Sequence, residues 1–218
     1  MPAIALEDIS VQYGQQQVLG PVSLHIDADQ FTVFIGKSGG GKSSLLNRAY
    51  DLLSSQQQVA FIPQDLGLVD SLSAYQNVYM GRLHQRSTLY NLTNLLRPRK
   101  TDIVAISHQL DRLDMADKCW QATGELSGGQ QQRVAIARAL YQQADILIAD
   151  EPISALDGPR AGQVMSLLRE QYPSAMIALH DLDMALHFAE RIIGIADGQI
   201  ALDQPADRLS RQSLLDFY

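Results

Sequence analysis

The chain has 218 residues, enough for one domain with a substantial core, and its 17 Lys and Arg against 24 Asp and Glu give a formal net charge of −7. This acidic balance argues against nucleic acid as a partner, and we expect none. No apolar run approaches the roughly 20 residues that cross a bilayer. The single cysteine, Cys119, excludes an intrachain disulfide, and the N-terminus does not resemble a signal peptide, so a cytoplasmic location is expected.

The first part of the chain predicts strands and one helix. Alternating apolar residues over 4–11 and 22–26 indicate two half-buried strands that form an antiparallel N-terminal piece. The continuously apolar segment 31–35 predicts a strand covered on both faces, followed by a glycine loop and a helix from about Lys42. Residues 59–64 predict another short strand, ended by Pro63.

The remainder alternates helices with strands after a polar helical insertion. The pattern over 71–118 is helical, which indicates an inserted subdomain. Strands are then predicted at 146–150, 176–180 and 191–197, with helices between them and a short polar end. This order indicates a largely parallel sheet. The expected fold is therefore α/β, a single domain over 1–218 with a helical subdomain at about 70–125.

A glycine loop after the third strand predicts a phosphate-binding site. The segment "GKSGGGKS" matches G-x-x-x-x-G-K-[ST] between a strand and a helix, as that motif requires. Main-chain N–H groups of such a loop surround phosphates, the lysine reaches the outer phosphates and the hydroxyl that follows it ligates Mg²⁺. The expected nucleotide-binding residues are Gly36, Lys37, Ser38, Gly39, Gly40, Gly41, Lys42, Ser43 and Ser44.

Polar side chains at the ends of other strands are the candidates for the chemistry. Asp150 and Glu151 follow a buried strand, at the edge where open α/β sheets bind ligands. Asp150 can hold Mg²⁺, while Glu151 can orient and deprotonate a water molecule. His180 ends another strand and should face the phosphates, although a structural histidine is the alternative. Gln64 could reach Mg²⁺ and the water through its amide oxygen.

A second glycine loop, "LSGGQ", precedes a helix rich in alanine and arginine. Unpaired N–H groups and the helix dipole make such a helix start suitable for an anion. A chain of this size is expected to bind one nucleotide through its first loop. The anion held by Ser127, Gly128, Gly129 and Gln130 therefore needs another explanation.

These motifs, taken together, resemble the ATP-binding subunit of ABC transporters over almost the whole chain. The first loop is similar to Walker A, "LSGGQ" to the ABC signature, "ILIADE" to Walker B with its catalytic glutamate, and "SALD" at 154–157 to the D-loop. The resemblance implies that Tyr13 stacks on adenine, that Gln64 and His180 are the Q-loop and switch residues, and that ATP and Mg²⁺ are the cofactors. Ser43, Gln64 and Asp150 are then the metal ligands.

The resemblance also implies partners. Two such domains pair head to tail, as a homodimer or a heterodimer, and the signature loop of one covers the ATP bound by the other. A separate transmembrane permease would carry the solute, so the chain is expected at the inner face of the membrane. In an importer a substrate-binding protein would assist. The stretch between Lys42 and Gln64 is shorter than usual in this family, so the antiparallel β-subdomain is expected to be trimmed, which leaves the role of Tyr13 open.

The cargo is suggested by one short segment. "GRLHQRSTLYNLTNLL" resembles the ATPases of phosphonate importers at Gly81, Arg82, Leu83, Ser87 and Thr88. Another small-solute importer and a lipid or peptide exporter are alternatives, as is a soluble ABC ATPase acting on ribosomes or DNA. A P-loop kinase would have no need of "LSGGQ". The basic residues of this region could form a solvated face or contact a permease or anionic lipid; they are Arg82, Arg86, Arg97, Arg99 and Lys100.

Overall fold

The structure is a computed structural model that describes residues 4–217, apart from the side chains of Gln16 and Asp216. The chain divides into two compact units. The first unit holds the residues up to Gln64 together with 145–154 and the chain from Pro159 onward. The second unit holds 65–144 and 155–158, so it includes the helix after the second glycine loop as well as the predicted insertion.

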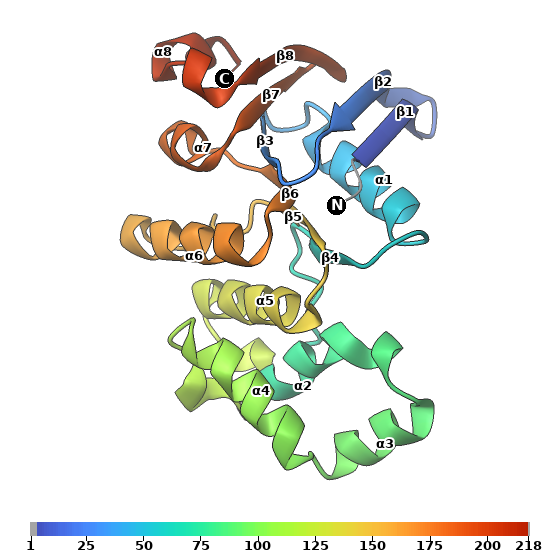
Figure 1. Cartoon of the computed structure of the whole chain (residues 1–218), viewed down its shortest axis with the longest axis vertical. Helices are drawn as coiled ribbons and strands as arrows, with labels where there is room; N and C mark the ends of the chain where they lie inside the picture. Colours follow the sequence, from blue (N-terminus) through green and yellow to red (C-terminus); the bar gives the residue numbers. More distant parts are fainter. Residues whose placement is uncertain (1–3, 218) are drawn as a thin grey trace. The chain divides into compact units, whose positions relative to one another are not determined.

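The first unit is built on a six-stranded sheet with the order β4-β5-β6-β3-β7-β8. Strands β3 to β7 are parallel, and the apolar segments predicted to be buried strands are buried; the bounds are β3 (Phe31–Ile35), β4 (Val59–Ile62), β5 (Ile146–Asp150), β6 (Ser174–Ala178) and β7 (Arg191–Ala196). The sheet confirms the α/β prediction (Figure 1).

The last strand, β8 (Gln199–Pro205), is missing from the sequence prediction, which gave only a short polar end. It pairs antiparallel with β7 at the edge of the sheet. Five of its seven residues are exposed, and only Ile200 and Leu202 are half-buried, so the apolar pattern is too short to indicate a strand.

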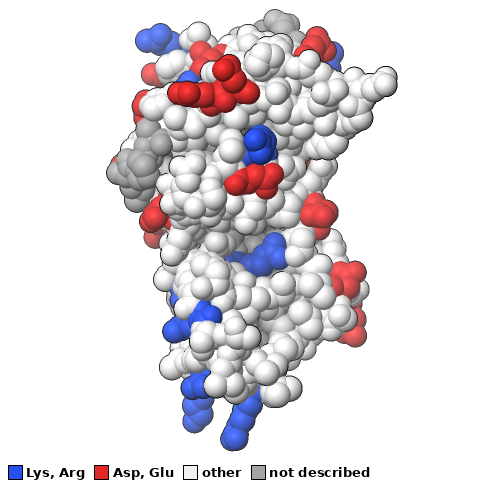
Figure 2. Space-filling view, turned by 90° about the vertical axis from the view of Figure 1, so that its right-hand side faces the viewer, with Lys and Arg blue, Asp and Glu red and all other residues white. Residues whose placement is uncertain are grey.

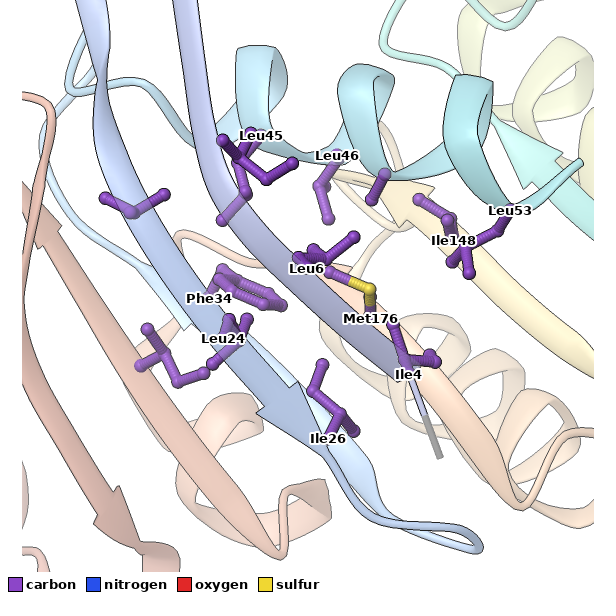
Figure 3. Packing of buried hydrophobic residues seen from close by; sticks show 14 of the residues in the cluster. Ile4, Leu6, Leu24, Ile26, Phe34, Leu45, Leu46, Leu53, Ile148 and Met176 are labelled. Atoms are coloured by element: carbon purple, nitrogen blue, oxygen red, sulfur yellow. The ribbon is translucent and has the colours of Figure 1, made fainter. Parts of the chain in front are cut away.

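The N-terminal hairpin and the first helix enclose the main core. β1 (Ile4–Tyr13) pairs antiparallel with β2 (Gln16–Ile26), as predicted. Figure 3 shows Leu24 of β2 beside Phe34 of the central sheet, and Ile4 of β1 beside Met176 of β6. Leucines of α1 (Lys42–Leu53), such as Leu46, join the same buried cluster.

Helix α1 connects to β4 by a short turn, and no strand lies between them in the described chain. The rings of Tyr50 and Phe61 stack across this connection with centroids 4.4 Å apart. In Figure 1, α1 lies on one side of the central strands and α6 and α7 lie on the other. The remaining helices of this unit are α6 (Gly158–Gln171), α7 (Leu182–Phe188) and α8 (Arg211–Leu214), with short 3₁₀ turns at Ala206–Arg208 and Leu215–Phe217.

The second unit is helical. Its helices are α2 (Ala74–Tyr79), α3 (Thr88–Leu96), α4 (Lys100–Asp111) and α5 (Gly128–Gln142), with 3₁₀ turns at Met80–Gln85, Ala116–Lys118 and Thr123–Glu125. The fully buried Asn77 joins the loops around α2, because its amide donates to the carbonyls of Leu72 and Ser73 and to the Thr123 hydroxyl. Over residues 4–217, none of the helices combines the length and the apolar character that crossing a membrane requires.

Candidate active site

Four neighbouring strands end at the same edge of the sheet, and each leads into one of the predicted motifs. The parallel strands β4, β5, β6 and β3 are adjacent in that order. Gln64 follows β4, Asp150 ends β5 and His180 follows β6, while the glycine loop follows β3. The strand order changes direction around β3, and ligands of open α/β sheets bind at such a point.

The glycine loop begins at Gly36, a position that only glycine can occupy without strain. Gly36 has a φ of 139°, and a Cβ there would lie 2.2 Å from the carbonyl oxygen of Ile195. The loop ends at Gly41, which starts α1 without a side-chain cap, and the first turn of α1 contains no acidic residue. The N–H groups at this helix start are therefore available to an anion.

Lys42 lies inside the loop, and its side chain is held by main-chain oxygens. The residue is 5 % exposed. Its Nζ donates to the carbonyls of Gly36 and Lys37 at 2.6 and 3.0 Å. Burial lowers the pKa of this amine, while the charges of Glu151 and Asp150 oppose the shift. A strong positive centre thus lies within the predicted phosphate site.

Asp150 is almost completely buried, with 3 % of its surface exposed. Burial raises its pKa, a hydrogen bond from the Ser43 hydroxyl and the charge of Lys42 lower it, and the Glu151 carboxylate raises it further. Its Oδ1 atom is buried without a hydrogen-bond partner. An orphaned carboxylate oxygen close to a hydroxyl matches the all-oxygen ligands that Mg²⁺ prefers, so the residues present fit this ion.

The raised pKa of Asp150 predicts a gain in stability when its charge is removed. The folded protein holds the Asp150 proton more tightly than the unfolded chain, so ionisation above the folded pKa costs free energy of folding. We expect Asp150→Asn to raise the Tm of the nucleotide-free protein at pH 7. The gain should shrink as the pH falls toward 3.8, the ordinary pKa of the carboxyl group.

Thermal melting at a series of pH values measures this effect. Asp145→Asn is the matched control, because Asp145 is exposed immediately before the same strand and its Tm should be unaffected. A Tm for Asp150→Asn at pH 7 equal to or below that of the parent would contradict the argument.

Glu151 and His180 form a close pair. The Glu151 Oε1 and His180 Nε2 atoms are 2.6 Å apart, and the carboxylate side chain is the more buried of the two. The Glu151 backbone is left-handed, with a φ of 53°, a conformation that costs a non-glycine residue about 1 kcal/mol. The turn after β5 is therefore held in an unfavourable conformation at the residue predicted to be the base.

Gln64 and Tyr13 are more peripheral. Gln64 is exposed in the turn that follows β4. Tyr13 ends β1 and is 62 % exposed. A cavity of about 550 Å³ adjoins the glycine loop, and Tyr13 is not among its lining residues, which are Gln17, Val18, Lys37, Ser38, Gly39, Gly40, Ile195, Ala196, Asp197, Gly198 and Phe217.

The second glycine loop, in the second unit, begins helix α5 with reciprocal hydrogen bonds. The Ser127 hydroxyl accepts from the Gln130 N–H at 3.4 Å, and the Gln130 amide oxygen accepts from the Ser127 N–H at 2.9 Å. The hydroxyl proton of Ser127 is not used in this pair, so it can be donated to an anion. The N–H groups of Gly128 and Gly129 belong to the same helix start.

Helix α5 also positions the "SALD" segment. A Cβ at Gly129 would lie 2.8 Å from the carbonyl oxygen of Ala155, so the glycine permits close approach. The Gln132 side chain, 2 % exposed, accepts a hydrogen bond from the Ala155 N–H at 2.9 Å. Gln132 is not among the site residues predicted from the sequence. Its spacing from Ser127 places it one turn into the helix, but nothing in the sequence indicates its partner.

The loop, the buried lysine and the two carboxylates define a nucleotide-hydrolysing protein of the P-loop class. More particularly, the chain belongs to the ABC transporter family, whose model, described as "ABC transporter", matches residues 19–154. It is an ATP-binding cassette that hydrolyses ATP, as the sequence predicted.

Relatives of the chain cover nearly its full length. It is 36 % identical to the phosphonates import ATP-binding protein PhnC of Frankia casuarinae, over 97 % of this chain and 94 % of the relative. It is 37 % identical to PhnC 3 of Halalkalibacterium halodurans, over 99 % and 93 %. Among solved structures it resembles the dimeric ABC transporter cassette MJ0796, with 27 % identity, a TM-score of 0.81 and coverage of 93 % and 98 %. A post-hydrolysis dimer of MJ0796 bound to ADP and Pi gives 26 % identity, a TM-score of 0.77 and coverage of 94 % and 99 %.

Proposed function

We propose that this chain is the Mg²⁺-dependent ATPase subunit of an importer for phosphonates or related phosphorus oxyanions. The assignment of phosphonate as the cargo is supported by the similarity, over nearly the whole chain, to relatives named as phosphonate import ATPases. The observation that supports the metal is the orphaned oxygen of Asp150 close to the Ser43 hydroxyl. The chain supplies ATP hydrolysis, and a separate permease carries the solute.

Each residue at the sheet edge has a role in this proposal. The N–H groups of the glycine loop and the Lys42 amine bind the phosphates of ATP. Ser43 and Asp150 would hold Mg²⁺, with Gln64 as a further ligand. The ion would neutralise charge that develops on the phosphates during transfer. Glu151 accepts the proton of the attacking water at its carboxylate.

His180 acts through Glu151. Its Nε2–H donates to the Glu151 Oε1 atom at 2.6 Å, which fixes the orientation of the base. The base is therefore held ready before the nucleotide arrives.

The second glycine loop supports a site shared between two copies. One chain carries two loops suited to phosphate but is expected to bind one nucleotide through the first. We assign Ser127, Gly128, Gly129 and Gln130 to the ATP held by a partner cassette, in a homodimer or with a related chain. A head-to-tail contact of this kind closes into a two-fold dimer when each chain donates both surfaces.

The exposed face of α3 supports a contact with the permease. Leu89, Leu92 and Leu96 are 72, 56 and 82 % exposed, although they follow the spacing of one helix face. No acidic residue occurs over 71–101, in a chain of net charge −7. Figure 2 shows Lys and Arg, without Asp or Glu, at the lower end of the view. This face would suit an acidic, partly apolar cytoplasmic segment of a permease and would hold the chain at the inner face of the membrane.

Arginines of this region differ in their freedom to meet such a partner. Arg82 stacks over the ring of Tyr141 at 4.4 Å, and Arg86 and Arg99 lie over the ring of Tyr90 at 5.1 and 4.4 Å. These stacking contacts fix their guanidinium groups within the second unit. Arg97 and Lys100 are the exposed charges left for a partner.

Uptake by cells that make the full transporter tests the cargo. We expect labelled phosphonate to accumulate with the parent subunit and to fall to background with Glu151→Gln. The matched control, Glu7→Gln, alters an exposed residue of β1 and should leave uptake unchanged. Phosphonate and phosphite accumulation that is unaffected by Glu151→Gln would reject this cargo.

Purification from solubilised membranes accompanies the uptake measurement and separates the two functional classes. A multi-span protein, with or without a substrate-binding protein, should be recovered with the tagged chain. Recovery of ribosomes in its place would favour the soluble ABC ATPase, the alternative from the sequence.

A further inference from the structure

The wall of the cavity beside the glycine loop includes a residue from the far end of the chain. Phe217 lines this cavity together with the loop residues Lys37–Gly40 and the β7–β8 turn. Tyr13 is expected from the sequence to stack on the base of the nucleotide, but it does not line the cavity and is 62 % exposed. An aromatic ring is nevertheless present on this side of the loop.

The position of Phe217 is built into the fold. A Cβ on Gly194 of β7 would lie 2.9 and 3.0 Å from ring atoms of Phe217, so the ring packs directly on bare main chain. The preceding helix α8 is anchored by Leu214, which is fully buried, and begins with a capping box at Ser210. The segment therefore holds its aromatic residue against the central sheet.

The residues that line the cavity differ in their chemistry. Lys37 and the glycine loop supply a positive charge and main-chain N–H groups, whereas Val18, Ile195 and Phe217 offer apolar surface. Asp197 and Gln17 add hydrogen-bonding groups suited to sugar hydroxyls. A nucleoside attached to phosphates in the glycine loop matches this combination of an anion site, polar groups and an aromatic wall.

We propose that Phe217 contacts the nucleoside part of the bound ATP and so makes the C-terminal segment part of the nucleotide site. The ring supplies a face for the base or sugar, and Gly194 is required because any side chain there would displace that ring. This proposal rests on the binding of ATP by the glycine loop. It concerns affinity for the nucleoside and leaves the cleavage of phosphate to the residues described above.

Binding measurements with ATP and with inorganic tripolyphosphate separate the two parts of the ligand. We expect Phe217→Ala to weaken ATP binding by roughly tenfold, the loss typical of one base stacked on an aromatic ring, and to leave tripolyphosphate binding within about twofold of the parent. Leu215→Ala is the matched control, because Leu215 is in the same segment, is 40 % exposed and does not line the cavity. Tyr13→Ala, measured beside it, shows whether the two rings share the base.

Two further variants keep the test independent of folding. Phe217→Leu retains apolar volume on Gly194, so it should keep the parent Tm and still weaken ATP relative to tripolyphosphate. Gly194→Ala places a Cβ 2.9 Å from Phe217 and 2.9 Å from the Leu202 Cβ, so it is compared only at the parent Tm, where it should give the same selective loss. An unchanged Kd for ATP in both Phe217 variants would overturn the proposal. An equal loss of ATP and tripolyphosphate would also overturn it, because Phe217 would then act only by supporting the loop.

Discussion

Glu151→Gln should reduce the ATP turnover of the purified protein by about 10³-fold while preserving ATP binding, because the amide keeps the size of the side chain but cannot accept a proton. His180 Nε2–H can still donate to the amide oxygen, so the pair seen at 2.6 Å should survive in outline. With ATP bound and not hydrolysed, the two cassettes should remain together. Phosphate release measures turnover, and gel filtration with ATP measures the dimer.

The control for this experiment is again Glu7→Gln, which should hydrolyse ATP like the parent. His180→Ala provides a second comparison. If His180 acts by orienting Glu151, its loss should lower turnover less than the loss of the base itself, and it should not stabilise the dimer to the same extent. Parental phosphate release from Glu151→Gln would show that Glu151 is not the base.

Mixing two inactive chains should restore activity if each ATP site is shared. One chain carries Lys42→Ala and the other carries Ser127→Asp. In the heterodimer, one composite site contains both changes and the other contains neither. With random pairing and independent sites, about a quarter of the parental activity should return, because half of the dimers carry one intact site in two.

Aspartate at position 127 separates the two roles of Ser127, which are capping helix α5 and binding an anion. Ser127 caps α5 through Gln130, and aspartate is an equally good N-cap, so the helix should remain intact while the new charge repels a phosphate. Ser127→Asn is the comparison, since it keeps the cap without adding charge and its amide N–H can replace the hydroxyl donor, so it should lower activity much less than Ser127→Asp.

Retention of ATP gives a second readout that does not depend on turnover. In a Glu151→Gln background, the heterodimer should retain one ATP and each homodimer of the two damaged chains none. Heterodimers that are present but retain no ATP would contradict a shared site.

Much of this fold was predictable because the local patterns are strong. Period-two alternation gave the β1–β2 hairpin, and the continuous apolar run of 31–35 gave a strand buried on both faces. The family and the ATPase activity followed from motifs whose order was clear in the sequence, and both are confirmed. The helix from Lys42 begins where the sequence placed it.

Other features depend on contacts between distant residues and left no local pattern. β8 lies at a sheet edge, and only Ile200 and Leu202 are half-buried in it, so its apolar pattern is shorter than the one that identified β1. Phe217 is placed against the glycine loop by its packing on Gly194, which is a property of the assembled sheet. Gln132 could be located on a helix, but its bond to Ala155 could not be anticipated. The assigned roles of Tyr13 and Gln64 stay predictions.

The hydrogen bonds of Lys42 have a consequence for the energetics of nucleotide capture. In the structure its amine donates to the carbonyls of Gly36 and Lys37, and these bonds tie the two ends of the loop together. These hydrogen bonds restrict the conformation of the loop, so little conformational entropy remains to be lost when phosphate binds. An incoming phosphate must compete with these carbonyls for the same protons. When the nucleotide binds, the Lys42 amine exchanges the two carbonyl acceptors for phosphate oxygens. This exchange lowers the affinity for nucleotide and favours the release of ADP and phosphate after each cycle.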